Sequence, residues 1–412
     1  MKKLLEKYRY KDSLKASVKE SYGWAIMESF GINYIQAYAI HLKSSSLQIA
    51  LLGNLIHIIG GIGQFFGSFL VSKIQNRLLI LKTTIFLQGV FWLLIGLLPF
   101  IIKDKNLLTN LNFILFISFF LILTSSLPAW ISLLGDLVPS KIRGKYFGIR
   151  NKYSTLVLIL SLIISGIILE FTKYHMLAQL GYLICFFLAG LGRLYSAYQF
   201  TKHIEPEYIE PKVKEYSFLK FIKIINKLDY GNFVIFYSLL LTGVQTLAPF
   251  VAIFLLDYLD FTYIEFSLFF ITGLFGRVIT QKKLGELTDK IGSANVIKLS
   301  GIIISIIPLL LAISTNHIYL ILINIIGGIG WGGMILTENI YLYEKVPKQN
   351  RAKFISYKSI IAAAACLIGV FLGDFILKLA SYEFLYLFIF SAVFRIIVCS
   401  LFFSKIKSVK IS

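Results

Sequence analysis

Apolar stretches of about twenty residues alternate with short polar stretches along the whole chain. A helix needs about 20 predominantly apolar residues to cross the hydrocarbon core of a bilayer. The stretches are continuous, unlike the alternating pattern of a barrel strand. We therefore predict an all-α membrane protein. The predicted spans are twelve: 18–42, 46–71, 78–102, 107–135, 152–172, 177–200, 233–257, 262–283, 294–314, 317–342, 353–379 and 382–404.

A polar segment with several lysines separates the sixth predicted span from the seventh. It contains Glu205, Pro206, Glu210 and Pro211, a composition that does not continue a membrane span. The chain is thus expected to form two bundles of six helices. The predicted organisation is a cytoplasmic lead at 1–17, an N-terminal bundle at 18–200, a cytoplasmic linker at 201–232, a C-terminal bundle at 233–404 and a cytoplasmic tail at 405–412.

One short basic segment occurs twice, at corresponding places in the two halves. Residues 136–145 read Asp-Leu-Val-Pro-Ser-Lys-Ile-Arg-Gly-Lys, and residues 344–353 read Glu-Lys-Val-Pro-Lys-Gln-Asn-Arg-Ala-Lys. The offset of 208 residues is about half of the 412-residue chain. A constant offset of this kind indicates an internal duplication. The two bundles are therefore predicted to be pseudo-symmetric.

The charges lie mostly on one side of the predicted spans. The chain is 57% hydrophobic and 15% charged, with a net charge of +20, whereas soluble domains carry about 25% charged residues. Of the 41 Lys and Arg residues, 32 fall on one predicted side of the membrane and 5 on the other. Positive residues collect on the cytoplasmic side. We predict a multi-pass protein of the cell (inner) membrane with both termini cytoplasmic, and the charge then needs no nucleic-acid partner.

Two loop motifs resemble those of a known family. Residues 285–292 read Gly-Glu-Leu-Thr-Asp-Lys-Ile-Gly, close to the Gly-x-Leu-x-Asp-Arg/Lys-x-Gly loop of the major facilitator superfamily, and Ser72 stands at the acidic place of the corresponding N-terminal loop. The Pro-x-x-x-Arg-Gly/Ala element after the fourth and tenth spans is also similar to that family. The resemblance implies a monomeric secondary transporter that binds a small solute between two bundles and works by alternating access.

The charged residues of the repeated loops have two interpretations. One is a charge relay that latches one state of the transport cycle. The other is a topology signal with surface ion pairs, each worth about 0–1 kcal/mol. The duplication favours the latch. The candidate residues are Asp136, Arg143, Arg150, Asp289, Lys290, Glu344 and Arg351.

Acidic residues inside the first span are costly in lipid, so a functional role is the default. Glu20, Trp24 and Glu28 share one helical face. Glu28 lies roughly 15 Å into the span at 1.5 Å per residue. It is the leading candidate for a carboxylate that couples transport to protons or binds substrate. Glu20 is expected nearer the interface, solvated or paired with Lys19 or another cation.

Polar residues in other spans are candidate cavity linings or packing contacts. In the second span Asn54, His57 and Gln64 share a face, and His57 has a side chain that titrates near neutral pH. Glycines beside them equally suit close helix packing. Arg193 and Arg395 are expected to extend toward the membrane surface.

The second half offers similar candidates. In the tenth span Asn324, Trp331 and Glu338 share a face, and glycines beside them suit either packing or a binding site. In the seventh span Tyr237 and Gln245 lie on one side, with a kink expected at Pro249. No single charge cluster stands out, which favours a neutral or zwitterionic substrate.

Other functional classes are less well supported. The chain has no Gly-x-x-x-x-Gly-Lys-Ser/Thr motif for an ATP motor. It has no metal-ligand spacing and no nucleophile–base set, so neither an enzyme nor a cofactor is predicted. A lipid-linked oligosaccharide flippase, an integral membrane enzyme and a non-transporting sensor remain the alternatives to a secondary transporter.

Overall fold

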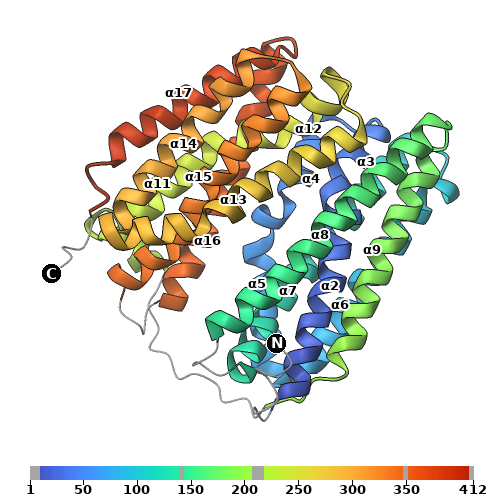
Figure 1. Ribbon diagram of the computed structural model, residues 1–412, viewed down its shortest axis with the longest axis horizontal. Helices are drawn as coiled ribbons and strands as arrows, with labels where there is room; N and C mark the ends of the chain where they lie inside the picture. The colour runs from blue at the N-terminus through green and yellow to red at the C-terminus, as the bar shows by residue number, and fades with distance from the viewer. Residues whose placement is uncertain (1–9, 139–142, 207–217, 347–350, 408–412) are drawn as a thin grey trace. The chain divides into compact units, whose positions relative to one another are not determined.

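The structure, a computed structural model, describes residues 10–138, 143–206, 218–346 and 351–407. Its described residues are helical, with turns and short loops between the helices (Figure 1). Backbone N–H and C=O groups in lipid have no water to bond with, and a helix satisfies them internally. The chain folds into two compact units, Met1–Pro211 and Lys212–Ser412. We call them unit 1 and unit 2.

Unit 1 follows the first six predicted spans, with two of them broken. Its helical segments are α2 (Lys11–Phe30), η1 (Ile32–Tyr34), α3 (Ile35–His41), α4 (Ser46–Ile58), α5 (Gly60–Ile74), α6 (Arg77–Ile101), α7 (Lys105–Leu137), α8 (Arg143–Tyr174) and α9 (Ala178–Phe200).

Unit 2 follows the last six. Its helical segments are α10 (Phe218–Ile224), η3 (Ile225–Lys227), α11 (Asp229–Gln245), η4 (Ala248–Phe250), α12 (Val251–Ile253), η5 (Phe254–Tyr258), α13 (Tyr263–Ile291), α14 (Ser293–Ile313), α15 (His317–Lys345), α16 (Arg351–Leu379) and α17 (Phe384–Phe402).

The first and seventh predicted spans are both interrupted in their second half. In unit 1 the chain breaks at Gly31, where an added Cβ would lie 2.5 Å from the ring of Trp92. In unit 2 the break contains Pro249 in a 3₁₀ turn, as the predicted kink requires. The second predicted span is also divided, into α4 and α5, whereas its counterpart α13 is continuous. Ten helices of the described residues are long and apolar enough to cross a membrane.

The two units repeat one pattern of helix packing. In unit 1 the most extensive contacts are α2 with α8 and α9, α6 with α7 and α9, and α5 with α7. In unit 2 the corresponding pairs are α11 with α16 and α17, α14 with α15 and α17, and α13 with α15. Capping boxes begin α4 at Ser45 and α13 at Thr262. The predicted pseudo-symmetric all-helical membrane fold is confirmed.

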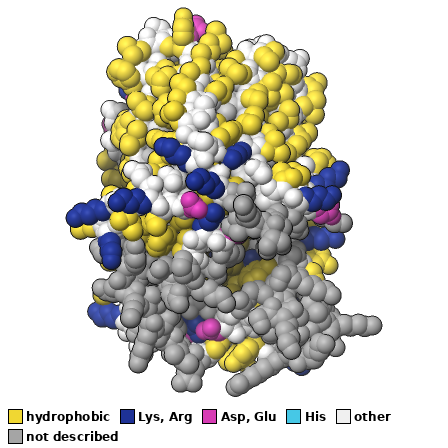
Figure 2. Space-filling model, turned by 90° about the vertical axis from the view of Figure 1, so that its left-hand side faces the viewer, with side chains coloured by type: hydrophobic (Ala, Val, Ile, Leu, Met, Phe, Trp, Pro, Cys, Tyr) yellow, Lys and Arg dark blue, Asp and Glu magenta, His cyan; other side chains and the backbone are white. Residues whose placement is uncertain are grey.

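Hydrophobic side chains cover much of the outer surface. On α17, Leu385, Ile389, Val393 and Ile396 are all 42–50% exposed and lie on one helical face. Figure 2 shows a face with a broad hydrophobic field, and Lys and Arg side chains gather at its margin. An exposed apolar area of this size suits lipid rather than water.

Candidate functional site

A pocket of about 220 Å³ lies among the helices of unit 1. It combines charged, aromatic and aliphatic side chains from α2, α6, α7, α8 and α9. The lining residues are Glu20, Trp24, Leu81, Ile85, Ser126, Leu127, Trp130, Arg150 and Arg193.

Glu20 on α2 binds two arginines at this pocket. Arg150 Nη2 on α8 donates to Glu20 Oε2 at 2.8 Å, and Arg193 Nη1 on α9 lies 3.9 Å from Glu20 Oε1. The Glu20 and Arg193 side chains are 4% and 2% exposed, and that of Arg150 is 10% exposed. Buried charges of this kind are stable only when they are paired and hydrogen-bonded. The cluster therefore holds three helices of unit 1 to one another.

Neighbouring groups fix both guanidinium groups. Arg150 Nε donates to the Ser17 carbonyl oxygen at 3.2 Å. Arg193 Nε donates to the Gln88 side-chain oxygen at 2.8 Å, and Arg193 Nη2 donates to the same oxygen. Because an arginine fork has a fixed shape, these bonds set the direction of its remaining donors.

Two tryptophans lie beside the two arginines. The Arg193 guanidinium carbon is 5.1 Å from the Trp24 ring centroid, and that of Arg150 is 5.1 Å from the Trp130 ring centroid. Both distances fall within the range of cation–π attraction. Trp24 Nε1 also donates to Glu28 Oε2 at 2.8 Å. Trp24 thus connects the pocket to the half-buried Glu28, one turn further along α2.

The described residues at the pocket carry an excess of positive charge. Arginine keeps its proton in proteins, so the two guanidinium groups face a single carboxylate, that of Glu20. Two buried donors nearby, Arg193 Nη1 and Gln88 Nε2, have no hydrogen-bond acceptor among the described residues. The pocket can therefore receive further acceptor atoms.

The structure corrects several expectations for this region. Glu20 is paired with cations, which was one of the two states expected for it, but these are Arg150 and Arg193 rather than Lys19, and it is buried rather than solvated. Arg193 is buried in the pocket instead of extending to the membrane surface, and Arg395 is likewise buried, donating to the Ile304 carbonyl oxygen at 2.9 Å. The premise that no charge cluster exists is wrong. Its members were missed because they are far apart in sequence; only the helical spacing of Glu20 and Trp24 signalled it.

Other predicted residues of unit 1 lie elsewhere. Gln64 is exposed on α5, and the side chains of Asn54 and His57 lie outside the described residues. On α5, Gly67 approaches α7 so closely that an added Cβ would lie 2.1 Å from the Ser125 carbonyl oxygen. Gly67 therefore serves close packing of α5 against α7.

In unit 2 the structure brings two predicted site residues together with a lysine that was not among the candidates. Lys358 Nζ on α16 donates to Glu338 Oε2 at 2.9 Å and lies 4.7 Å from the Tyr237 ring centroid. Both charged side chains are less than 20% exposed. Lys358 lies within α16, inside the predicted span 353–379. The three side chains form a second charged and aromatic cluster.

The remaining predicted residues of unit 2 have different surroundings. Asn324 Nδ2 donates to the Phe269 carbonyl oxygen, and Asn324 lies against Gly273, which gives it a role in packing α15 against α13. Gln245 is buried at the end of α11, and Trp331 packs against the core of unit 2. These two are not part of the cluster at Glu338.

The predicted loop residues divide into three groups. Asp136 binds Arg77, and Glu344 accepts from Ser293 Oγ at 2.6 Å, so each acid at a helix end contacts the start of a neighbouring helix. Arg150 belongs to the pocket, and Lys290 is exposed. The side chains of Arg143, Asp289 and Arg351 lie outside the described residues.

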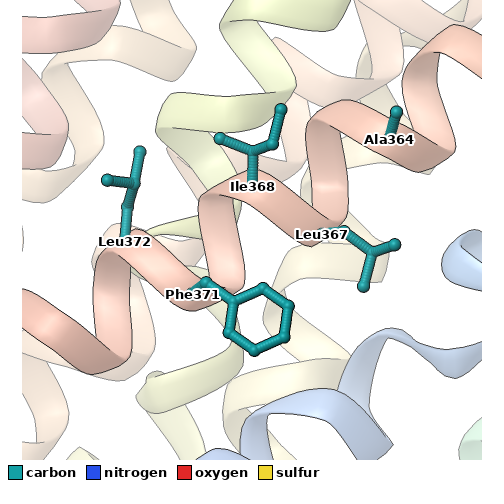
Figure 3. Close-up of a pocket in the computed structure, with 5 residues that line it drawn as sticks. All are labelled: Ala364, Leu367, Ile368, Phe371 and Leu372. Atoms are coloured by element: carbon teal, nitrogen blue, oxygen red, sulfur yellow. The ribbon is translucent and has the colours of Figure 1, made fainter.

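A second hollow, of about 550 Å³, lies beside α16. Its described lining is entirely apolar: Ala364, Leu367, Ile368, Phe371 and Leu372 (Figure 3). A polar solute finds no hydrogen-bonding side chain among these five residues, so the pocket of unit 1 is the better candidate site.

Two repeated bundles of apolar helices, with charged clusters buried inside them, define a polytopic membrane carrier. The sequence model described as Major Facilitator Superfamily matches residues 21–280 and 233–410. The chain belongs to the major facilitator superfamily, as its loop motifs predicted. It is a multi-pass membrane transporter of small molecules and not an enzyme.

The fold is similar to those of several transporters over nearly the whole chain. A mutant of the nucleoside transporter NupG has a TM-score of 0.72 at 13% identity, covering 96% of this chain and 100% of that chain. A bacterial homologue of the iron transporter ferroportin, in an inward-facing state, has a TM-score of 0.68 at 18% identity, covering 96% and 98%. At these identities the likeness shows the fold alone.

One curated relative matches a shorter segment. The glucose transporter GlcP of Staphylococcus epidermidis is 33% identical over 88 residues, which are 21% of this chain and 20% of that protein. The matched segment thus spans about a fifth of the relative's length.

Proposed function

We propose that this protein is a proton-coupled secondary active transporter that moves a small solute by alternating access, with Glu28 as the proton-carrying group. The observation that carries the proposal is the chain of contacts from the half-buried Glu28 through Trp24 to the buried Arg193 and Glu20. It links a carboxylate inside a membrane span to a pocket of suitable size for a small molecule. Ionisable residues at such depth mark ion and substrate pathways.

The surroundings of the acids support Glu28 as the proton carrier. Glu20 and Glu338 already bind Arg150 and Lys358 at 2.8 and 2.9 Å, in ion pairs that hold helices of each unit together. Glu28 accepts a hydrogen bond from the indole of Trp24. An indole N–H can donate to a carboxylate or to the carbonyl oxygen of a carboxylic acid. That contact is therefore compatible with both protonation states that coupling requires.

The orientation in the membrane is part of the proposal. The excess of Lys and Arg on one side of the spans supports cytoplasmic termini, a cytoplasmic linker and insertion in the cell (inner) membrane. The two repeated units contained in one chain support a monomer as the transporting form.

The repeated loops are proposed to latch one conformational state. The contacts of Asp136 with Arg77 and of Glu344 with Ser293 support this role, because both join a loop-side acid to the start of a neighbouring helix. We expect Arg143→Ala to lower the rate of uptake while membrane insertion is retained. An unchanged uptake rate would rule the latch out.

The transport proposal is tested in liposomes containing the purified protein. A pH gradient is imposed, and uptake is measured for a panel that includes glucose, nucleosides and small carboxylates. We expect Glu28→Gln to abolish uptake driven by the gradient while exchange of labelled for unlabelled solute continues. Glu383→Gln, which removes an exposed acid at the start of α17, is the control. Gradient-driven uptake that persists in Glu28→Gln contradicts the proton assignment.

A further inference from the structure

We infer that the pocket of unit 1 binds the carboxylate group of a small organic solute between Arg150 and Arg193. That the bound carboxylate is also the transported solute rests on the function proposed above; that the pocket binds it rests on the geometry alone. The inference depends on the charge of the pocket, its open donors, the position of Glu20 and the shape of its walls.

The charge of the pocket calls for an anion. Arg150 and Arg193 are nine-tenths or more buried, and among the described residues Glu20 is the one carboxylate that lines the pocket with them. A buried cation without full compensation is unfavourable, because it has lost its water and gained too little in return. Arg150, Arg193 and Glu20 together carry one net positive charge, and a bound carboxylate neutralises it.

The open donors of the pocket point to an oxyanion. Arg193 Nη1 is buried, has no hydrogen-bond acceptor among the described residues, and lies 3.9 Å from Glu20, beyond hydrogen-bonding distance. Gln88 Nε2, whose partner oxygen already accepts from Arg193, is a second buried donor without an acceptor in the described part of the chain. A carboxylate has two oxygens and about four acceptor sites, which match the open guanidinium nitrogen of Arg193 and the amide nitrogen of Gln88.

Glu20 shows that a carboxylate fits this position. Its Oε2 atom already accepts from Arg150 at 2.8 Å, as an oxygen of a bound solute would. Glu20 is therefore a competing internal ligand. A solute that takes over part of the contact with the arginines displaces the Glu20 carboxylate, and removal of the Glu20 charge strengthens solute binding.

The walls of the pocket limit the rest of the solute. Trp24 and Trp130 each lie against one of the arginines, and Leu81, Ile85 and Leu127 supply apolar surface. The volume of about 220 Å³ is below the range of about 300–1,000 Å³ usual for drug-sized ligands. These features suit a compact monocarboxylate with a short apolar body.

Binding is tested on the purified full-length protein by calorimetry and by thermal shift at constant ionic strength. The probes are sodium lactate, sodium benzoate, the neutral amides of both acids, and inorganic phosphate. We expect at least one carboxylate to bind and raise the unfolding midpoint, as a ligand of the folded state does. We expect its amide not to bind.

Three variants place the bound carboxylate. Arg150→Gln and Arg193→Gln each remove a charged hydrogen bond, and we expect the affinity to fall at least about tenfold. Glu20→Gln removes the competing carboxylate, and we expect the affinity to rise. Lys15→Gln, which removes a partly exposed cation of α2 outside the pocket, is the charge-matched control with unchanged affinity.

Each outcome decides the inference. Equal binding of acid and amide, binding of phosphate without either carboxylate, or full affinity in both arginine variants overturns it, as does the absence of binding in both wild type and Glu20→Gln. If the arginine variants do not fold, Glu20→Gln decides: tighter carboxylate binding supports the site, and unchanged or weaker binding overturns it. Carboxylate binding without exchange in liposomes keeps the site and contradicts its transport role.

Discussion

Glu205, just beyond the end of α9, provides a sharp test of how unit 1 is held together. Its Oε1 atom accepts from Arg77 Nε at 2.7 Å, and its Oε2 atom accepts from the Leu78 backbone N–H at 2.8 Å. Arg77 also donates to Ser132, Asp136 and the Pro206 carbonyl oxygen, and its side chain is fully buried. Glu205→Ala removes two of these contacts at once.

The expected destabilisation follows from these contacts. The hydrogen bond from Arg77 contributes about 1.5–3 kcal/mol because it is charge-assisted, and the bond from Leu78 is that of a carboxylate at a helix N-terminus, worth about 1 kcal/mol. Since Asp136 still pairs with Arg77, the buried guanidinium is not left entirely without a carboxylate. We therefore expect a loss of roughly 3 kcal/mol in the free energy of unfolding, which corresponds to about 6–12 °C in a unit of this size.

The measurement is the thermal unfolding midpoint of purified protein in detergent. Asp136→Ala is the first comparison: its side chain is 49% exposed, against 24% for Glu205, so we expect a smaller decrease. Asp12→Ala is the second, because Asp12 pairs with Lys15 at 3.8 Å on the surface and should cost about 0–1 kcal/mol. A decrease in Glu205→Ala no larger than that of Asp12→Ala refutes the reasoning.

Three further predictions concern other parts of the chain. For the pair of Glu338 and Lys358, a double-mutant cycle with Glu338→Gln and Lys358→Met should give a coupling energy above about 1 kcal/mol in thermal unfolding, and additive effects contradict the buried pair. Asn324 donates to the backbone of α13, so Asn324→Ala should lower the unfolding midpoint without changing the KM of uptake. A variant that changes only KM would support a binding role instead. Burial lowers the pKa of His203 below its usual 6.5, so His203 is neutral in the folded protein while the unfolded chain binds a proton below about pH 6.5. The midpoint should therefore fall between pH 7 and pH 5, less steeply in His203→Gln, and equal slopes in the two proteins contradict this.

The fold was largely predictable because it depends on local patterns. Apolar runs of helical length set the spans, and the offset of 208 residues revealed the repeat. The breaks were only partly predictable. Pro249 signalled one of them, because a proline limits the backbone by itself. At the other break Gly31 leaves room for Trp92 on another helix, and no local pattern reports such a contact.

The candidate site was predictable only where its residues share a helix. Glu20, Trp24 and Glu28 were found from their spacing along α2, and the bond between Trp24 and Glu28 agrees with it. Arg150 and Arg193 were assigned other roles because a charge near a helix end is usually a surface or topology feature. Tertiary packing brings them to Glu20, and the packing is set by distant glycine contacts such as Gly23 against Gly192.

The pairing of Glu20 has a consequence for how the protein is made. Arg150 is synthesised 130 residues after Glu20, and Arg193 later still. At about 5–20 residues per second, the wait for Arg150 alone is roughly 7–26 s. During that time the first helix carries the Glu20 carboxylate without either of the arginines that pair with it in the folded unit. The first helix is not among the ten helices apolar enough to cross a membrane on their own. We therefore expect the first helix to reach a stable place in the bilayer only after the fifth and sixth spans have emerged.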